Sequence, residues 1–341
     1  MSKPVCLVTA PVATRSGYGA HGRDICRALI KLDKYDVKIW PVRWGNTPMN
    51  ALNKDDPNDK MIIDRILPNP QLPKQPELHI HIVIPNEFQT FGKYNIGITA
   101  GLEMTACPPG WLEGMNKMNM NIVPSTFVKD MLTNIKFDIN NEQDGKKVGE
   151  LKSDKPIEVL FEGTDTNIFK KTNEFSKEFV DEMKKVKESF NFLYVGHWLQ
   201  GDLGKDRKDT GMMLKVFLET FKNLKQKPGL IMKTSGATYS VIDRETMLNK
   251  IQIIKDMVKG DLPNIYLLHG DFDDEEMNQI YNHPKVKAHI NLTHGEGFGR
   301  PLLEASISQK PVIATNWSGH LDFLNKNLAV LVGGGLQNVE K

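Results

Sequence analysis

The segment HGEGFGRPLLEA, residues 294–305, sets glycines at alternate positions ahead of a predicted helix. Gly295, Gly297 and Gly299 allow the backbone to lie close to a ligand. Pro301 suits the first helical turn, where a missing N–H costs nothing. Because the first N–H groups of a helix have no partner within it, this position favours an anion such as phosphate, or a sugar hydroxyl.

The same segment carries two carboxylates, Glu296 in the loop and Glu304 about one turn into the helix. A carboxylate accepts two hydroxyl hydrogen bonds at once, so it can bind the vicinal diol of a ribose or a hexose. We therefore predict that both face one ligand. The structural alternative is that Glu296 is an ordinary loop charge and Glu304 a solvated helix residue.

The elements around this segment follow the pattern of parallel sheets with crossover helices, because short apolar runs alternate with amphipathic stretches. The predicted strands form two sets: residues 5–10, 36–42, 78–84, 95–100, 120–124 and 157–161, and then 190–196, 229–234, 264–270, 288–293, 311–315 and 328–332. Polar residues 140–156 are predicted to be an exposed loop. The α/β chain is thus expected to hold two doubly wound Rossmann-like domains that face a central cleft.

We expect the first domain to span residues 1–165, a linker or hinge 166–190, and the second domain 191–341. Such folds bind ligands beyond the carboxyl ends of their strands. The linker runs into a helix with a charged, solvated face.

A second glycine cluster, SGYGAHG, has GxGxxG spacing through Gly17, Gly19 and Gly22. Six residues separate the preceding strand from Gly17, and the next strand ends near Arg43 instead of the acid that would bind a ribose. These features argue against NAD or FAD. We interpret the cluster as a flexible loop whose N–H groups approach a phosphate or sugar at a helix start, or as a plain strand-to-helix loop.

The composition limits the functions to consider. The chain has 341 residues, and 44 basic against 42 acidic residues leave a net charge of +2, so no strong overall field draws it to nucleic acid or anionic lipid. Cys6, Cys26 and Cys107 are odd in number and contain no CxxC pair, which argues against disulfides and zinc. The start does not resemble a signal peptide, and no apolar run approaches membrane-spanning length. We expect a cytoplasmic protein without an integral membrane segment.

The segment 294–305, followed by KPVIATNWSGHLDFL, resembles the nucleotide-sugar signature of retaining GT-B glycosyltransferases of family 4. PIEVLFEGTDTNIF is similar to the interdomain segment of that family. Residues 190–221 are similar to the first strand and helix of its donor domain. In the N-terminal half the resemblance is looser and rests on the glycine loop and on LEMTACPPGWLEGMNKMNMNIVPSTFVKDML.

The resemblance implies roles for residues 294–305. Glu304 would bind the ribose hydroxyls of the donor nucleotide, and Glu296 the hydroxyls of the transferred sugar. Backbone amides around Gly297, Phe298 and Gly299 would meet the sugar and the diphosphate.

The resemblance to the family also implies which residues outside 294–305 bind the diphosphate and the base. Arg207 and Lys208 would neutralise the leaving diphosphate, with solvated side chains at a helix start as the structural alternative. Lys233 would add charge. The loop with Asp271 and Phe272 is where the family binds the base.

The sequence departs from the family pattern at several points. His197 stands where the family commonly has arginine. Because a neutral imidazole stabilises a diphosphate less well than a guanidinium does, the resemblance implies that Arg207 and Lys208 supply more of this stabilisation. Glu103 lies about where relatives have a histidine near the reacting carbon. It would orient or deprotonate an acceptor hydroxyl, or else act as a helix-start residue. His79 and His81 are expected on opposite sides of their strand, in structural roles. We expect the second domain to lack the C-terminal crossover helices that are usual in this family.

These features lead to the hypothesis of a metal-independent retaining glycosyltransferase without a cofactor, which moves a sugar from a nucleotide-diphosphate donor to an acceptor hydroxyl. The acceptor is a glycan, a small molecule or, alternatively, a modified base of viral DNA, an idea prompted by the lysine- and asparagine-rich composition. Residues 1–165 hold equal numbers of basic and acidic residues, which does not favour DNA. A nucleotide-sugar epimerase, a phosphorylase and a non-catalytic binding protein of the same fold also stay open.

Overall fold

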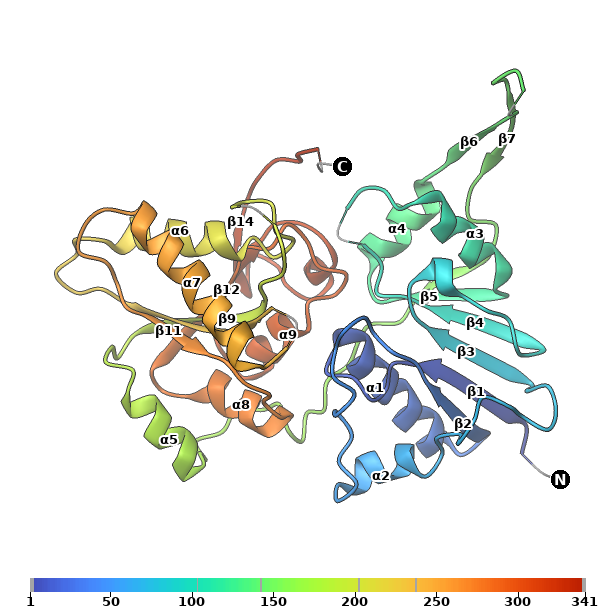
Figure 1. Ribbon diagram of the computed structural model, residues 1–341, viewed down its shortest axis with the longest axis horizontal. Helices are drawn as coiled ribbons and strands as arrows, with labels where there is room; N and C mark the ends of the chain where they lie inside the picture. Colours follow the sequence, from blue (N-terminus) through green and yellow to red (C-terminus); the bar gives the residue numbers. More distant parts are fainter. Residues whose placement is uncertain (1–2, 103, 142, 202, 237, 339–341) are drawn as a thin grey trace. The chain divides into compact units, whose positions relative to one another are not determined.

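The computed structural model describes residues 3–102, 104–141, 143–201, 203–236 and 238–338. The chain forms two compact units, Met1–Gly163 and Thr164–Lys341, which are called here the N-terminal and the C-terminal unit. Each contains one six-stranded sheet (Figure 1).

All six strands of the N-terminal sheet run parallel, in the order β2-β1-β3-β4-β5-β8. Their apolar runs become strands because both faces of a parallel sheet are covered. The strands are β1 (Val5–Ala10), β2 (Asp36–Pro41), β3 (Leu78–Ile82), β4 (Tyr94–Ile98), β5 (Met120–Val123) and β8 (Ile157–Val159). The helices are α1 (Gly17–Leu32), α2 (Pro57–Ile63), η1 (Pro85–Glu87), α3 (Pro109–Lys117) and α4 (Thr126–Asn134).

The glycine cluster at the front is helical, so its interpretation as a flexible loop is wrong. Gly17, Gly19 and Gly22 lie in the first turns of α1, and the N–H of Gly19 donates to the hydroxyl of the N-cap Ser16. A Cβ on Gly19 would lie 2.3 Å from the carbonyl oxygen of Thr14. Gly19 is therefore needed for close packing of the helix start on the loop that precedes it.

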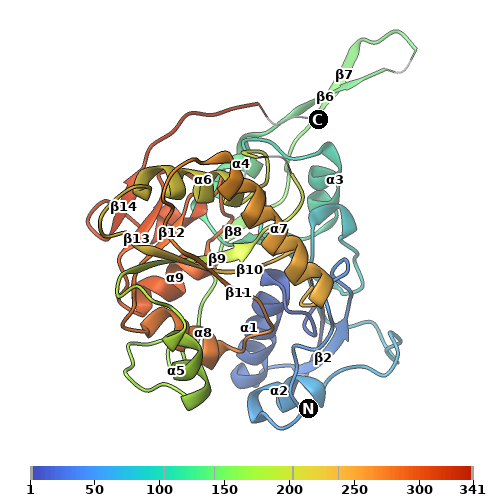
Figure 2. The ribbon, with the colours of Figure 1, turned by 60° about the vertical axis from the view of Figure 1, so that its left-hand side comes forward.

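Residues 140–156 are not a plain exposed loop, because a β-hairpin extends through residue 151. Strands β6 (Phe137–Asn140) and β7 (Lys147–Leu151) pair antiparallel and project from the body of the N-terminal unit (Figures 1 and 2). Asn141 accepts hydrogen bonds from the N–H groups of Gln143 and Gly145, and Gly145 has a φ of +68°. These turn contacts outweigh the low apolar content of the segment.

The prediction that His79 and His81 face opposite sides of β3 is wrong, since residues two apart in a strand share a face. Their ring centroids lie 5.3 Å apart. His79 contacts the hydroxyl of Thr9 at 3.0 Å, and Nδ1 of His81 accepts the N–H of Gln89. Burial lowers the pKa of His79 to about 4 and that of His81 to about 3, so both are neutral hydrogen-bonded core residues.

The C-terminal sheet is also parallel, with the order β11-β10-β9-β12-β13-β14. Its strands are β9 (Asn191–His197), β10 (Gly229–Ser235), β11 (Ile265–Leu268), β12 (Val286–Asn291), β13 (Val312–Thr315) and β14 (Ala329–Val332). Counted along the chain, the order is 3-2-1-4-5-6, in which the winding reverses between β9 and β12. In this class of sheet, ligands bind at that reversal, beyond the carboxyl ends of the strands.

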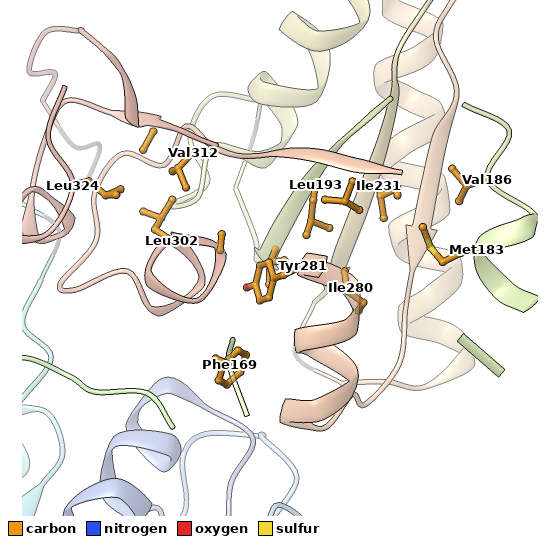
Figure 3. Close-up of a cluster of buried hydrophobic side chains, with 14 residues drawn as sticks. Phe169, Met183, Val186, Leu193, Ile231, Ile280, Tyr281, Leu302, Val312 and Leu324 are labelled. Carbon is orange, nitrogen blue, oxygen red and sulfur yellow. The ribbon is translucent and has the colours of Figure 1, made fainter. Parts of the chain in front are cut away.

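The helices of the C-terminal unit are α5 (Lys177–Lys184), α6 (Thr210–Phe221), α7 (Val241–Met257), α8 (Asp274–Asn282), α9 (Arg300–Ile307) and η2 (Gly319–Asp322). One apolar cluster joins α6 and α7 to β9 and β10. A second joins α8 and α9 to β9, β12 and β13 (Figure 3).

Residues 166–190, suggested as a linker by the sequence, contribute to the second cluster. Phe169, Met183 and Val186 are buried there with Leu193 of β9 and Ile280 of α8 (Figure 3). This segment packs as part of the C-terminal unit.

The core of this unit also contains a histidine that burial keeps neutral. His289 of β12 is fully buried, and neither ring nitrogen has a hydrogen-bond partner among the residues that the structure describes. Burial lowers its pKa to about 3, against an ordinary value of 6.5. The unfolded chain therefore binds more protons between these two pH values, and the native state loses stability as the pH falls through this window.

We expect His289→Leu to remove this acid sensitivity. Between pH 7 and 4.5 the stability lost on acidification should shrink by roughly 2 to 3 kcal/mol. At neutral pH the variant should be at least as stable as the wild type, because an unpaired buried polar group is removed. Denaturant unfolding of both proteins at the two pH values measures the difference. An equal loss of stability in both proteins would contradict this account of His289.

No helix in the described part of the chain is long and apolar enough to cross a bilayer.

Candidate functional site

Two loops meet at the point where the winding of the C-terminal sheet reverses. One follows β9 and leads to α6, and the other follows β12 and leads to α9. The carbonyl of Arg207 in the first loop accepts the N–H of His294 at 3.2 Å and the hydroxyl of Thr293 at 3.1 Å. Nε2 of His294 lies 3.3 Å from the carboxylate of Asp209. These contacts fasten the two loops together.

A buried ion pair also joins these two loops. The ammonium of Lys208 donates to Oε1 of Glu296, and the two side chains are 11% and 7% exposed. Asn291, the last residue of β12, also donates to Oε1 of Glu296, at 3.4 Å. Lys208 is thus not a solvated helix-start lysine, and Glu296 is not an ordinary loop charge.

Two opposing effects set the charge state of Glu296. Burial alone would raise its pKa, but the charges of Lys208 and Arg207 and the hydrogen bond from Lys208 outweigh burial and lower the pKa below the ordinary value. Glu296 is therefore ionised at neutral pH and acts as a hydrogen-bond acceptor. A buried carboxylate of this kind binds hydroxyl groups well.

The backbone of Glu296 is held by the segment that follows β13. Its N–H donates to the hydroxyl of Ser318 at 2.8 Å, and its carbonyl accepts the N–H of Gly319 at 2.9 Å. Nε2 of His320 donates to the carbonyl of Thr315 at 2.7 Å. The two stretches that resemble the nucleotide-sugar signature, 294–305 and 310–324, are thus joined by hydrogen bonds.

Gly299 ends the loop as the N-cap of α9, with a φ of +97° that favours glycine. A Cβ there would lie 3.2 Å from the Cβ of His320 and from Leu302. Phe298 beside it is buried against Phe323, with ring centroids 5.1 Å apart. The helix then begins at Arg300 with Pro301 in its first turn, as the sequence predicts.

Glu304 lies in α9 with its side chain 12% exposed. Oε2 accepts a hydrogen bond from the hydroxyl of Tyr281 at 3.0 Å, and Nε of Arg300 lies 3.8 Å from Oε1. Glu304 is therefore not a freely solvated helix residue.

His197 is the last residue of β9, where the first of the two loops begins. Nδ1 lies 3.2 Å from the hydroxyl of Ser235. Burial, followed by the charges of Lys233, Lys208 and Arg207, lowers the pKa of His197 to about 4. The imidazole is neutral at physiological pH, so it can accept or donate a hydrogen bond but adds no positive charge.

Lys233, near the end of β10, is held against aromatic rings. Its ammonium lies 5.2 Å from the ring centroids of both Tyr239 and Phe272, within the range of cation–π attraction. Phe272 follows β11 and is half-buried, whereas the neighbouring Asp271 is exposed. The lysine and the predicted base-binding loop thus lie side by side.

Comparison with known proteins identifies the architecture. No protein-family model and no curated protein sequence matches the chain. Among solved structures, it is similar to Anabaena Alr3699/HepE in complex with UDP and glucose, at 11% identity over 97% of this chain and 86% of that one, with a TM-score of 0.59. Sucrose-phosphate synthase from Thermosynechococcus elongatus is 13% identical over 97% and 86%, with a TM-score of 0.61. A glycosyltransferase from Rickettsia africae is 16% identical over 98% and 85%, with a TM-score of 0.61. The chain has the GT-B fold.

Within this GT-B chain, the structure brings most of the predicted site residues onto the carboxyl edge of one sheet. Those on the C-terminal unit are His197, Arg207, Lys208, Lys233, Asp271, Phe272, Glu296, Gly297, Phe298, Gly299 and Glu304. Gly17 and Gly19 belong to the other unit, and the N–H of Gly19 is already bound to Ser16. Glu103 lies outside the described residues.

Three residues at the candidate site were not predicted from the sequence. Asn291 and Ser318 hold Glu296, and Tyr281 holds Glu304. Asn291 carries a signal in the sequence, since it is a polar residue at the end of an apolar strand. Tyr281 carries none, because an aromatic residue in an amphipathic helix is typical of core packing.

No group of three or more histidine, cysteine, aspartate or glutamate side chains that could hold a metal ion occurs in the part of the chain that the structure describes.

Proposed function

We propose that the protein is a retaining glycosyltransferase, which transfers a sugar from a nucleotide-diphosphate donor to an acceptor hydroxyl without a metal ion. The observation that carries this proposal is the buried Lys208–Glu296 pair at the reversal of the C-terminal sheet. Glu296 lies in the loop before α9, and Glu304 lies about one turn into that helix. The pair and the second carboxylate place a cation and two hydroxyl acceptors around the start of one helix. That combination suits a sugar diphosphate.

In this proposal Glu304 accepts the ribose hydroxyls and Glu296 those of the transferred sugar. An ammonium group has three N–H donors, so pairing with Glu296 is compatible with a simultaneous contact between Lys208 and a diphosphate oxygen. Arg207 is exposed in the same loop and adds a second positive charge. Both cations stabilise the negative charge that develops as the bond to the diphosphate breaks.

Relatives of the same fold support a uridine nucleotide as the donor. The Anabaena protein was crystallised with UDP and glucose, and another of the solved structures contains UDP-2-fluoro glucose. The neutral His197 leaves Lys208 and Arg207 as the principal cations for the diphosphate. In this proposal the protein also raises the rate by holding the sugar donor and the acceptor hydroxyl in a reactive orientation.

The stereochemical outcome and the independence of metal are tested in one experiment. Purified protein is incubated with a UDP-sugar, and the anomeric configuration of the first product is followed by proton NMR, with and without EDTA. We expect the donor's configuration to be kept and the rate to be unchanged by EDTA. An inverted product would refute retention, loss of activity in EDTA would refute metal independence, and an isomerised nucleotide sugar would identify an epimerase instead.

A further inference from the structure

Tyr281 is a fully buried polar residue that contacts a predicted substrate-binding carboxylate. It lies in α8, and its hydroxyl is 3.0 Å from Oε2 of Glu304 in α9. Burial, with the charge of Glu304, raises the pKa of Tyr281 well above its ordinary value. The phenol therefore keeps its proton at every physiological pH, and the hydrogen bond runs from Tyr281 to Glu304.

The ring that carries this hydroxyl is fixed in place. Its centroid lies 6.5 Å from that of Phe169 and 6.0 Å from that of His289, with interplanar angles of 60° and 61°. Leu302 belongs to the same buried cluster and to the same helix as Glu304. Figure 3 shows the Tyr281 ring above Phe169 and beside the helix that bears Leu302, with its oxygen on the side of that helix. A buried ring has few alternative rotamers, so the donor is rigid.

The carboxylate needs such a support. A glutamate in a helix has three rotatable side-chain bonds, and ordering them costs free energy when a ligand binds. A contact from Nε of Arg300 to Oε1 of the same carboxylate is longer, at 3.8 Å. An ionised carboxylate offers about four lone-pair directions. The hydrogen bond from the rigid Tyr281 hydroxyl occupies one of these directions and therefore orients the group.

We propose that Tyr281 is a positioning residue, which orients the Glu304 carboxylate and so sets how strongly the site prefers a nucleotide with both ribose hydroxyls. This inference rests on the proposed function, because it assumes that Glu304 binds ribose. Tyr281 itself touches no substrate and takes no part in the chemistry.

The test compares Tyr281→Phe with the wild type, since this change removes the hydroxyl and keeps the ring. UDP, GDP and ADP are titrated by calorimetry, and the nucleotide that binds most tightly is compared with its 2′,3′-dideoxy form. Losing one hydrogen bond to a charged group should reduce the preference for the ribose form roughly three- to tenfold, through weaker binding of that form alone. In turnover, KM for the donor should rise by a similar factor at unchanged kcat.

Tyr266→Phe is the matched control. Tyr266 also donates to a carboxylate, Glu188, at 2.7 Å, and packs against the same buried cluster. We expect this variant to keep the wild-type preference, so that a general effect of losing a tyrosine–carboxylate bond is separated from the effect at Glu304.

The outcomes separate this inference from the proposed function. If Glu304→Ala weakens the ribose nucleotide but Tyr281→Phe leaves the preference unchanged, or weakens both nucleotide forms equally, the positioning role is refuted and the proposed function stands. If no nucleotide binds the wild type, or Glu304→Ala has no effect, the proposed function fails first.

Discussion

Alanine at position 208 is expected to lower kcat by about two to three orders of magnitude, because it removes a cation from the developing charge of the leaving diphosphate. The same change should destabilise the protein by about 3 kcal/mol, since it leaves the buried Glu296 carboxylate without its ion-pair partner. Glu296 is then expected to gain a proton more readily. Steady-state kinetics and thermal unfolding measure the two effects.

The two effects of this substitution can be separated. In the double variant Lys208→Met, Glu296→Gln no charge is left unpaired, so most of the stability should return while turnover stays low. Lys205→Ala is the control for charge in the same loop, because Lys205 is exposed. Turnover of Lys208→Ala within threefold of the wild type, at a temperature where the variant is folded, would refute the catalytic role of Lys208.

Alanine at position 304 is expected to weaken donor binding by roughly 100-fold. A carboxylate that accepts two ribose hydroxyls makes two charge-assisted hydrogen bonds, each worth about 1.5 to 3 kcal/mol. The net loss lies below their sum, because water replaces part of the contact. Glu304→Gln keeps one acceptor oxygen and should fall between alanine and the wild type. Calorimetric titration with the donor nucleotide measures all three affinities.

The control for this prediction is Glu219→Ala. Glu219 is an exposed glutamate of α6 that pairs with Lys215 one turn away, so its loss should change the donor affinity by less than twofold. Equal donor affinity for Glu304→Ala and Glu219→Ala would mean that Glu304 does not bind the ribose.

The strands of both sheets could be predicted from the sequence because parallel strands are buried on both faces. Residues 5–8 and 230–232 are continuously apolar for this reason. The order of the strands could not, since β9 pairs with β12 across nearly a hundred residues. That pairing depends on tertiary packing and not on local pattern.

Local chemistry also explains the incorrect predictions. The hairpin β6–β7 lacks an apolar run, and its turn contacts decide its structure. The sequence favours a flexible loop at Gly17, Gly19 and Gly22, whereas these residues are helical. The close approach of Thr14 leaves no space for a side chain at position 19. The opposite-face assignment of His79 and His81 was an error of strand periodicity.

The candidate site could be predicted where one segment carries its own chemistry. Residues 294–305 combine glycines, a helix start and two carboxylates. The pairing of Lys208 with Glu296 joins residues 88 positions apart, and the contact of Tyr281 with Glu304 joins two helices. Neither leaves a periodic signal in the sequence, so only the folded chain reveals them.

The central claim is tested most directly by measuring nucleoside diphosphate release from UDP-, GDP- and ADP-sugars by the wild type and by Glu304→Ala. We expect one donor to be hydrolysed slowly without acceptor by the wild type, and at least 100-fold more slowly by the variant when the donor is below its KM. Release from none of the donors, or equal release by both proteins, would contradict the assignment of this site to glycosyl transfer.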